Sequence, residues 1–369
     1  MNRPFGVPAS AGPNRLKAGL ETSGVFIGID GGGTHSFAIA VDSTGRKLGT
    51  AEAGSLNFFG TGLPTARRNL KALSASLRRQ LPREARIDRI AVGCAALFSD
   101  ATQTEKGSLC RGILPLERAR VVSDCQTACF GATLGRPGVV IVAGTGSIVV
   151  AQNEDGQLRR VGGWGHILGD AGSAYWLAVE SVKAAIASEE GLGPKTILGR
   201  LVREWFKIRK LTEIVPIVHC TEFTKDRFAM LASHLARTVG RRDAVFGVIC
   251  QRGGRALASH ALMAAKLARL KTRPLPVYLV GGVLTNNALL REGLMSALKS
   301  TCGVRIIEPR LSPLLGAAAL ALRDAGVELT VDIVANLEKS DLGAIADRTG
   351  KPAKLANRRT LRQIACTFE

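Results

Sequence analysis

The chain has 369 residues, of which 46% are hydrophobic and 22% charged, which suffices for about two folded domains and argues against global disorder. Its longest apolar run, at 138–151, is too short to cross a membrane, and residues 1–23 lack the apolar stretch of a signal peptide, so we expect a cytoplasmic protein with no membrane partner. The formal net charge of +20 first suggests nucleic acid, but the basic residues are dispersed and only 5% of residues are aromatic, which favours a solvated basic surface and no nucleic-acid partner.

The first half of the chain begins with three expected strands and then alternates between helices and strands. Residues 1–23 have the composition of a loose tail. The apolar patterns predict strands at 25–30, 36–42, 46–54, 87–97 and 119–124, and helices at 63–81, between the last two strands, and from Asp124 onward.

The second half repeats this order. Strands are expected at 138–145, 147–153, 158–163, 276–282 and 304–309, and helices within 171–270 (with breaks at 191–194 and near Pro216), at 286–300 and at 313–326. Residues after 327 are polar and mixed, and we expect a weakly structured extension there. The resulting division is a tail at 1–23, domains at 24–137 and 138–326, and an extension at 327–369, with an α/β fold and a duplicated architecture.

The first strand ends in the glycine-rich stretch DGGGT, residues 30–34. The letters of a dinucleotide fingerprint fit, but that fingerprint needs a helix after the glycines, and a strand is expected here. A hairpin with several glycines presents clustered backbone N–H groups that a phosphate can approach closely, and Asp30 could serve as an Mg²⁺ ligand. An ordinary tight hairpin explains the same letters.

A second turn of the same kind, GTGS at 144–147, follows the first strand of the second half. Asp30 and Gly144 are 114 residues apart and hold equivalent places in the two halves. Two such turns could hold a triphosphate from both sides, which favours phosphate binding over a pair of unrelated hairpins.

With these turns in place, the chain resembles the actin, sugar-kinase and Hsp70 superfamily, and within it the N-acetylglucosamine kinases and the wider BadF/BadG-type ATPases. The resemblance covers about residues 25–325 and rests on DGGGT, GTGS, SLNFFG (55–60), SDCQTACFGA (123–132), GGWGHILGDAGSAYW (162–176) and VYLVGGVLTNN (277–287). It implies two RNase-H-like domains with a nucleotide cleft between them, ATP and Mg²⁺ as cofactors, and a small sugar as substrate. It leaves a homodimer open.

The resemblance also implies roles for individual residues. ATP would be held by Asp30, Gly31, Gly32, Gly33 and Thr34 of the first turn, Gly144, Thr145, Gly146 and Ser147 of the second turn, and Gly281 and Gly282 near the adenine, with Asp30 also binding Mg²⁺. The sugar would be bound by Asn57, Gly163, Trp164, Gly165 and Asp170. Asp124 would be the catalytic base.

The structural alternatives to these roles are specific. Asp124 and Asp170 could each cap a helix, and Asn57 could stabilise its own turn. The chain also departs from the family's pattern: Ala171 stands where Glu is common, His35 where Lys or Arg is common, and Cys125 and Gln126 where small residues are usual. The loss of a carboxylate at position 171 bears on which sugar is bound.

The sequence therefore predicts an ATP-dependent amino-sugar kinase, with two alternatives. One is an ATPase activator of a radical dehydratase, which would use exposed cysteines such as Cys125 and Cys129 to hold an iron–sulfur cluster between subunits. The other is a sugar or nucleotide sensor without catalytic activity, and the loss of the family's carboxylate at Ala171 favours this alternative.

Overall fold

The computed structural model describes residues 24–98, 101–220, 225–299 and 303–340. The expected tail at 1–23 and the end of the extension, 341–369, lie outside the described residues. The strands are β1 (Val25–Gly31), β2 (His35–Val41), β3 (Lys47–Gly54), β4 (Ile87–Cys94), β5 (Ala119–Ser123), β6 (Gly138–Ala143), β7 (Ser147–Gln152), β8 (Leu158–Gly162), β9 (Leu275–Val280) and β10 (Val304–Ile307).

The α-helices alternate with these strands and, in the second half, form a long insertion. They are α1 (Phe58–Thr61), α2 (Leu63–Arg78), α3 (Gln103–Cys110), α4 (Asp124–Thr133), α5 (Gly165–Leu168), α6 (Ala174–Glu189), α7 (Leu198–Phe206), α8 (Ile214–His219), α9 (Lys225–Thr238), α10 (Ala244–Leu267), α11 (Gly282–Asn286), α12 (Ala288–Lys299), α13 (Pro313–Asp324) and α14 (Val331–Glu338). No helix in the described part of the chain is both long and apolar enough to span a bilayer.

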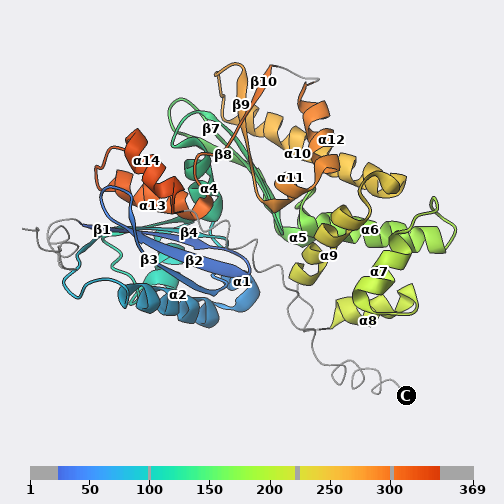
Figure 1. Ribbon diagram of the computed structural model, residues 1–369, viewed down its shortest axis with the longest axis horizontal. Helices are drawn as coiled ribbons and strands as arrows, with labels where there is room; N and C mark the ends of the chain where they lie inside the picture. Colours follow the sequence, from blue (N-terminus) through green and yellow to red (C-terminus); the bar gives the residue numbers. More distant parts are fainter. Residues whose placement is uncertain (1–23, 99–100, 221–224, 300–302, 341–369) are drawn as a thin grey trace, which may run out of the picture.

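The strands form two five-stranded sheets of the same topology (Figure 1). The first sheet has the order β3-β2-β1-β4-β5 and the second the order β10-β9-β6-β7-β8. In each, three antiparallel strands that follow one another along the chain are extended by two parallel strands that return through helices. The predicted duplication of architecture is confirmed.

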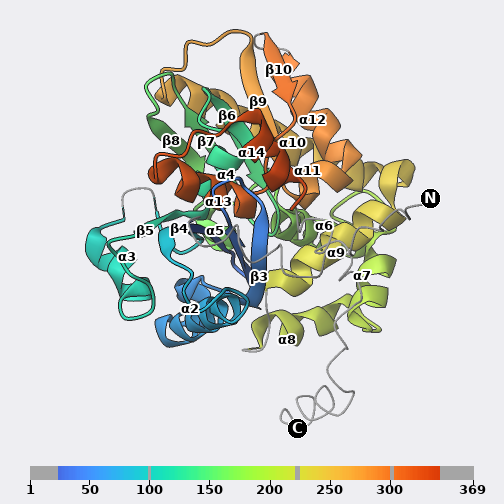
Figure 2. The same cartoon turned by 60° about the vertical axis from the view of Figure 1, so that its left-hand side comes forward.

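Each sheet is covered on both faces by apolar side chains. Leu70, Leu73 and Leu77 of α2 are buried against one face of the first sheet, because they recur at helical spacing on one side of that helix. The helices of the insertion bury one face of the second sheet. The remaining faces turn toward each other, and α4 and α13 lie between them in both views (Figures 1 and 2).

α13 joins the two halves more closely than the sequence predicts. We placed it with the second half, but its apolar face packs against the first sheet, and it crosses α4 at close range. A side-chain carbon at Gly316 would lie only 2.3 Å from the carbonyl oxygen of Thr127 and 2.7 Å from the Cα of Gly131. The glycines therefore set how closely the two helices approach. The boundaries 137/138 and 326/327 stay predictions.

The expected weak structure after residue 327 is wrong for the part that the structure describes. Thr330 caps a helix, α14, and the side chains of Val334 and Leu337 are buried in the same cluster as α13. In the sequence, these apolar residues do not indicate a packed helix, because the residues around them are mostly polar. Pro216, near which a break was expected, lies within the short helix α8.

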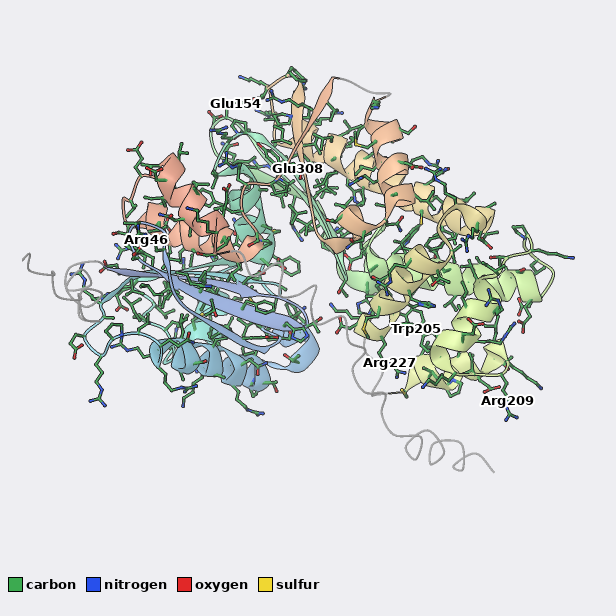
Figure 3. The ribbon with its side chains drawn as sticks, in the orientation of Figure 1. Arg46, Glu154, Trp205, Arg209, Arg227 and Glu308 are labelled. Atoms are coloured by element: carbon green, nitrogen blue, oxygen red, sulfur yellow. The ribbon has the colours of Figure 1, made fainter. Side chains whose placement is uncertain are left out.

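The basic residues are spread over the surface, as the sequence suggests. Arg46 lies in the first half of the chain, whereas Arg209 and Arg227 lie in the helical insertion of the second half (Figure 3).

Candidate functional site

Both glycine-rich stretches are hairpin turns at equivalent sheet positions. The N–H of Gly32 donates to the carbonyl of His35 (3.1 Å), so Gly33 and Thr34 form the tip between β1 and β2. In the second turn, the N–H of Gly144 donates to the carbonyl of Gly146 (2.9 Å) between β6 and β7. The dinucleotide alternative is excluded, since a strand follows the first turn.

The second turn is fixed from behind by the start of α6. The carbonyl of Gly144 accepts the N–H of Ala174 (2.9 Å), and the carbonyl of Thr145 accepts the N–H of Tyr175 (3.3 Å). The hydroxyl of Ser147 donates to the carbonyl of Ala171 (3.0 Å). These bonds hold the turn rigid before any ligand arrives.

Gly281 lies beside this second turn, at the end of β9. Its φ of 104° is unfavourable for other residues, and a side-chain carbon there would lie 2.4 Å from the carbonyl oxygen of Ala143. Gly282 then begins α11. The two glycines predicted on the adenine side are thus adjacent to the second turn, residues 144–147. Their role in binding adenine stays a prediction, as does phosphate binding by the turns at 30–34 and 144–147, which are called the first and second phosphate turns for that predicted role.

Two carboxylates lie close to the same edge of the first sheet: Asp30 near the end of β1, and Asp124 at the start of α4, directly after β5. Asp30 pairs with Gly93 of β4, and an added carbon at Gly93 would be 3.2 Å from the Cα of Asp124. Burial, followed by the charge of Asp124, raises the pKa of Asp30 from 3.8 to about 7. Burial also raises the pKa of Asp124, against the opposing effects of the Cys125 N–H and the charge of Lys225.

Asp124 does not cap its helix. Ser123 is the N-cap of α4, and its N–H donates to the side-chain oxygen of Gln126 (3.2 Å). The side chain of Gln126, where the family usually has a small residue, thus accepts a backbone N–H at the N-terminus of α4. The carboxylate of Asp124 interacts with the Cys125 N–H, and its remaining lone pairs are available for chemistry.

Asp170 lies against the second phosphate turn. It is buried, and one carboxylate oxygen would be 2.7 Å from a side-chain carbon at Gly146. Burial raises its pKa, while the N–H groups of Ser147 and Gly165 oppose the shift. The structural alternative, that it caps the following helix, is wrong, because α6 begins at Ala174 and is capped by the hydroxyl of Ser173.

Asn57 stands in a loop tied to the first phosphate turn. The N–H of Leu56 and the hydroxyl of Ser55 both donate to the carbonyl of Gly32 (3.3 and 3.2 Å). The side-chain oxygen of Asn57 accepts the N–H of Phe59 (3.2 Å) as the N-cap of α1. Asn57 therefore stabilises its own turn, as the structural alternative states. If it also binds sugar, its side-chain oxygen has to do so while it accepts this capping hydrogen bond.

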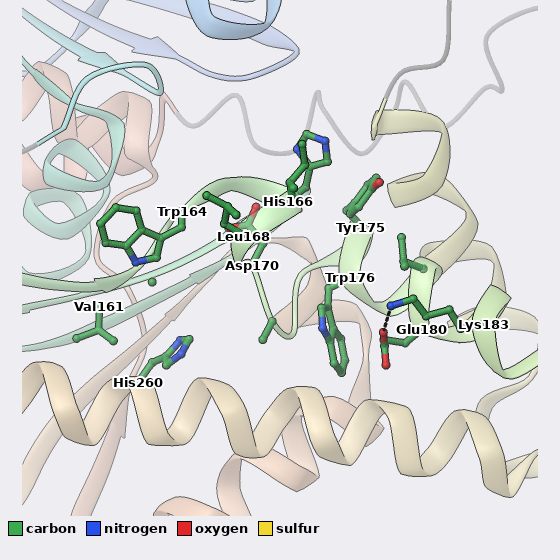
Figure 4. A pocket seen from close by; sticks show the side chains of 15 residues that line it. Val161, Trp164, His166, Leu168, Asp170, Tyr175, Trp176, Glu180, Lys183 and His260 are labelled. Carbon is green, nitrogen blue, oxygen red and sulfur yellow. Dashed lines mark hydrogen bonds and ion pairs between the residues drawn. The ribbon is translucent and has the colours of Figure 1, made fainter. Parts of the chain in front are cut away.

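Of the segment containing Gly163, Trp164 and Gly165, Trp164 lines a pocket with a volume of about 580 Å³. Figure 4 looks into this pocket, which is lined by Trp164, His166 and Asp170, by Tyr175 and Trp176 of α6, and by His260 of α10. Asp30 and Asp124 do not line it. It therefore adjoins the site at Asp170 and does not contain the predicted phosphoryl-transfer residues.

Arg160 of β8 links this segment to the first half of the chain. Its guanidinium carbon lies 4.6 Å from the ring centre of Phe98, in the loop after β4, and 5.0 Å from that of Trp164. Phe98 in turn is 6.3 Å from Phe59 of α1. Side chains from both halves thus meet at this edge of the site through cation–π contacts.

Lys225 and Asp226, at the start of α9, are the site residues that the sequence reasoning missed. The hydroxyl of Thr34 donates to the carboxylate of Asp226 (2.8 Å) over a separation of 192 residues. The ammonium nitrogen of Lys225 lies 3.4 Å from where a side-chain carbon would be at Gly33. Only the tertiary fold brings this helix end to the first phosphate turn, and no local motif marks it.

A family model described as the BadF/BadG/BcrA/BcrD ATPase family matches residues 27–321. The chain belongs to this family.

Several proteins similar to this chain are named as kinases of amino sugars. The chain is 26% identical to N-acetyl-D-glucosamine kinase of Dictyostelium discoideum, over 81% of this chain and 98% of that protein. It is 28% identical to N-acetylmuramic acid/N-acetylglucosamine kinase of Clostridium acetobutylicum, over 54% of this chain and 66% of that protein, slightly less than two thirds. A solved structure from Chromobacterium violaceum, of a protein assigned as an N-acetylglucosamine kinase, has a TM-score of 0.63 and 25% identity, over 81% of this chain and 98% of that one. The fold is therefore that of the two-domain actin-like ATPases, with the nucleotide cleft between the domains.

The acidic residues of this family member fit an Mg²⁺ ion that arrives with nucleotide. No three His, Cys, Asp or Glu side chains of the described residues are grouped as a metal site. Mg²⁺ bound with phosphates needs only one or two carboxylates, because waters and phosphate oxygens complete its octahedron. Asp30, half-buried beside the first turn, can supply one such carboxylate.

The cysteines near the site do not suit an iron–sulfur cluster held between subunits. Cys125 and Cys129 are buried against Val140 and Tyr278, and burial raises the pKa of each thiol to about 12. Cluster ligands are thiolates, and a shared cluster has to reach the surface. The kinase relatives favour the main interpretation over the dehydratase-activator alternative.

Proposed function

We propose that this member of the BadF/BadG/BcrA/BcrD family is an ATP-dependent amino-sugar kinase that transfers the γ-phosphoryl group of ATP to a hydroxyl of N-acetylglucosamine, glucosamine or a close relative. The observation that carries the proposal is the position of Asp124. It is a half-buried carboxylate that is free of helix capping, next to Asp30 and the first phosphate turn. The names of the kinase relatives support the substrate class.

In this proposal, the two glycine turns hold the phosphates of ATP through backbone N–H groups. Asp30 holds Mg²⁺, which supplies positive charge to the β- and γ-phosphates. Asn57, Trp164 and the backbone at Gly163 and Gly165 position the sugar, and Asp170 supports both the sugar and the second turn.

Asp124 accepts the proton of the sugar hydroxyl as that oxygen attacks the γ-phosphorus and the bond to the β-phosphate oxygen breaks. Its raised pKa suits a base, because a carboxylate held in a buried site accepts a proton more readily than one in water. Enclosure between the two domains would keep water from the γ-phosphate and limit hydrolysis of ATP.

The decisive measurement is ATP consumption by the purified protein over a panel of sugars that includes N-acetylglucosamine, glucosamine, N-acetylmuramic acid and glucose. We expect the amino sugars to stimulate turnover strongly over the rate without sugar. ATP hydrolysis that no sugar stimulates would contradict the kinase proposal.

Asp124→Asn provides the residue-level test. The variant should fold and bind nucleotide but lose about 10²- to 10⁴-fold in kcat, since the amide cannot accept the proton. Asp155→Asn, on the exposed turn between β7 and β8, is the matched control and should keep wild-type turnover. Near-normal turnover of Asp124→Asn would remove the base assignment.

A further inference from the structure

The phosphate site described above is rich in acids. Asp30, Asp124 and Asp170 all lie beside the two glycine turns, while the turns themselves contribute only backbone N–H groups and hydroxyls. A triphosphate carries several negative charges, and the charge of the transferred phosphoryl group is spread over its oxygens in the transition state. A bound Mg²⁺ offsets part of this, and a fixed cation from the protein is expected to offset more.

His35 does not supply that cation. It follows the first turn directly in the sequence, but its Nδ1 lies 3.1 Å from the carboxylate of Glu52, and both side chains are more than half exposed. Arg160 is likewise committed to the rings of Phe98 and Trp164.

Lys225 is placed where such a cation is needed. Its ammonium nitrogen is beside Gly33, the tip of the first turn, and its positive charge acts on Asp124, Asp170 and His166. Within the described parts of the chain it forms no ion pair within 4 Å, so its charge is not neutralised by a direct partner.

The contact between Thr34 and Asp226 fixes this placement. It anchors the first turn of α9 to the first phosphate turn, so the lysine that precedes Asp226 is held at the junction of the two domains. The ammonium group therefore comes from the domain opposite the one that carries Asp30 and Asp124.

We propose that Lys225 binds the γ-phosphoryl group of ATP and stabilises it during transfer, as a catalytic cation supplied by α9 across the nucleotide cleft. The inference rests on the proposed kinase function and adds a residue to it. Lys225 takes no part in bond making or proton transfer: the sugar oxygen forms the new bond to phosphorus, the bond to the β-phosphate oxygen breaks, ADP leaves, and Asp124 takes the hydroxyl proton.

The test compares Lys225→Met with Lys225→Arg and with Lys266→Met, an exposed lysine of α10 away from the site. Calorimetric titration with Mg²⁺ and either ADP or the non-hydrolysable analogue AMPPNP measures the contact with the γ-phosphate directly. For Lys225→Met we expect the Kd for AMPPNP to rise about tenfold while that for ADP stays within about twofold. We expect kcat to fall about 100-fold and Lys225→Arg to recover part of both losses.

Equal weakening of ADP and AMPPNP binding, or no change in either, would overturn the proposal. Thermal unfolding of each variant shows whether it is folded, and if Lys225→Met is not, Lys225→Gln takes its place in the same comparison. If the wild type phosphorylates no sugar, the kinase proposal fails, whereas the ADP and AMPPNP comparison still decides whether Lys225 contacts the γ-phosphate.

Discussion

At the scale of single residues, the most informative group is Asp30. Its carboxylate lies near the end of β1 at the first phosphate turn, next to a second half-buried acid, Asp124, and within the described residues it forms no ion pair. A carboxylate in such a place favours the protonated form until a cation arrives. Under the proposed function, this carboxylate would destabilise the nucleotide-free protein and would bind Mg²⁺ once nucleotide is present.

This arrangement predicts how stability depends on pH. The pKa of Asp30 is raised from 3.8 to about 7, so between these values the folded protein binds a proton that the unfolded chain has released. The contribution of Asp30 to stability is therefore lost as the pH rises from about 4 to 7. Asp30→Asn, which mimics the protonated form, should raise Tm relative to wild type at pH 8 by more than at pH 5, measured by thermal unfolding without nucleotide.

The control for this experiment is Asp155→Asn, whose Tm should follow that of wild type across the same pH range. Adding Mg²⁺ and ATP at pH 8 should stabilise wild type more than Asp30→Asn, because only the carboxylate can bind the ion. A Tm difference that shrinks with rising pH would show that Asp30 is not a buried, unpaired acid in the folded protein.

Residue roles were only partly readable from the sequence. The positions of the two glycine turns and of Asp124 follow from strand and turn signals alone. The capping alternative for Asp170 is wrong, because its left-handed backbone (φ 60°) turns the chain before the helix, and Ser173 is the cap. Lys225 could not be found at all, since it reaches the site through a contact between distant segments.

At the scale of elements, the crossing of α4 and α13 places the catalytic candidate. α4 carries Asp124 at its first position, and its central residues pack on α13. The crossing depends on the absence of side chains at Gly131 and Gly316. A shift of α13 would be transmitted directly to the start of α4.

Gly316→Ala and Gly247→Ala form a matched pair that tests this packing. Both glycines lie within helices, but an added carbon at Gly316 meets Thr127 and Gly131, whereas at Gly247 it meets nothing within 4 Å. Gly316→Ala should lower the free energy of unfolding by about 2 kcal/mol. Gly247→Ala should raise it by up to about 1 kcal/mol, because alanine favours helix. Denaturant unfolding measures both, and equal effects would argue against close packing at Gly316.

Most elements could be predicted because their patterns are local. The three antiparallel strands of each half alternate or run apolar over short stretches between turn residues. The sequence does not indicate α14, because its two buried side chains are covered only when α13 packs against the first sheet. No spacing within 327–340 encodes that crossing.

At the scale of the whole molecule, the two sheets share the helices between them. α4 buries side chains in the clusters of both sheets, and α13 and α14, late in the chain, complete the core of the first. Neither half can therefore bury its apolar surface fully without the other. The two domains are expected to unfold together despite the duplicated topology.

This expectation can be measured with the natural tryptophans. The three of them, Trp164, Trp176 and Trp205, lie in the second half, so their fluorescence reports on that half alone, while circular dichroism reports on the helices of both. We expect urea transitions followed by the two methods to have the same midpoint. Separate midpoints would show that the halves are independent folding units.

The contact of Arg160 with Phe98 and Trp164 has a practical consequence. Trp164 is 62% exposed, and its indole lies on a guanidinium that also rests on a ring from the opposite domain. Any change in the separation of the domains alters the surroundings of this one indole. With Trp176 and Trp205 replaced by phenylalanine, Trp164 would be a single intrinsic optical probe, and a change in the separation of the two domains could be followed by its emission without an attached dye.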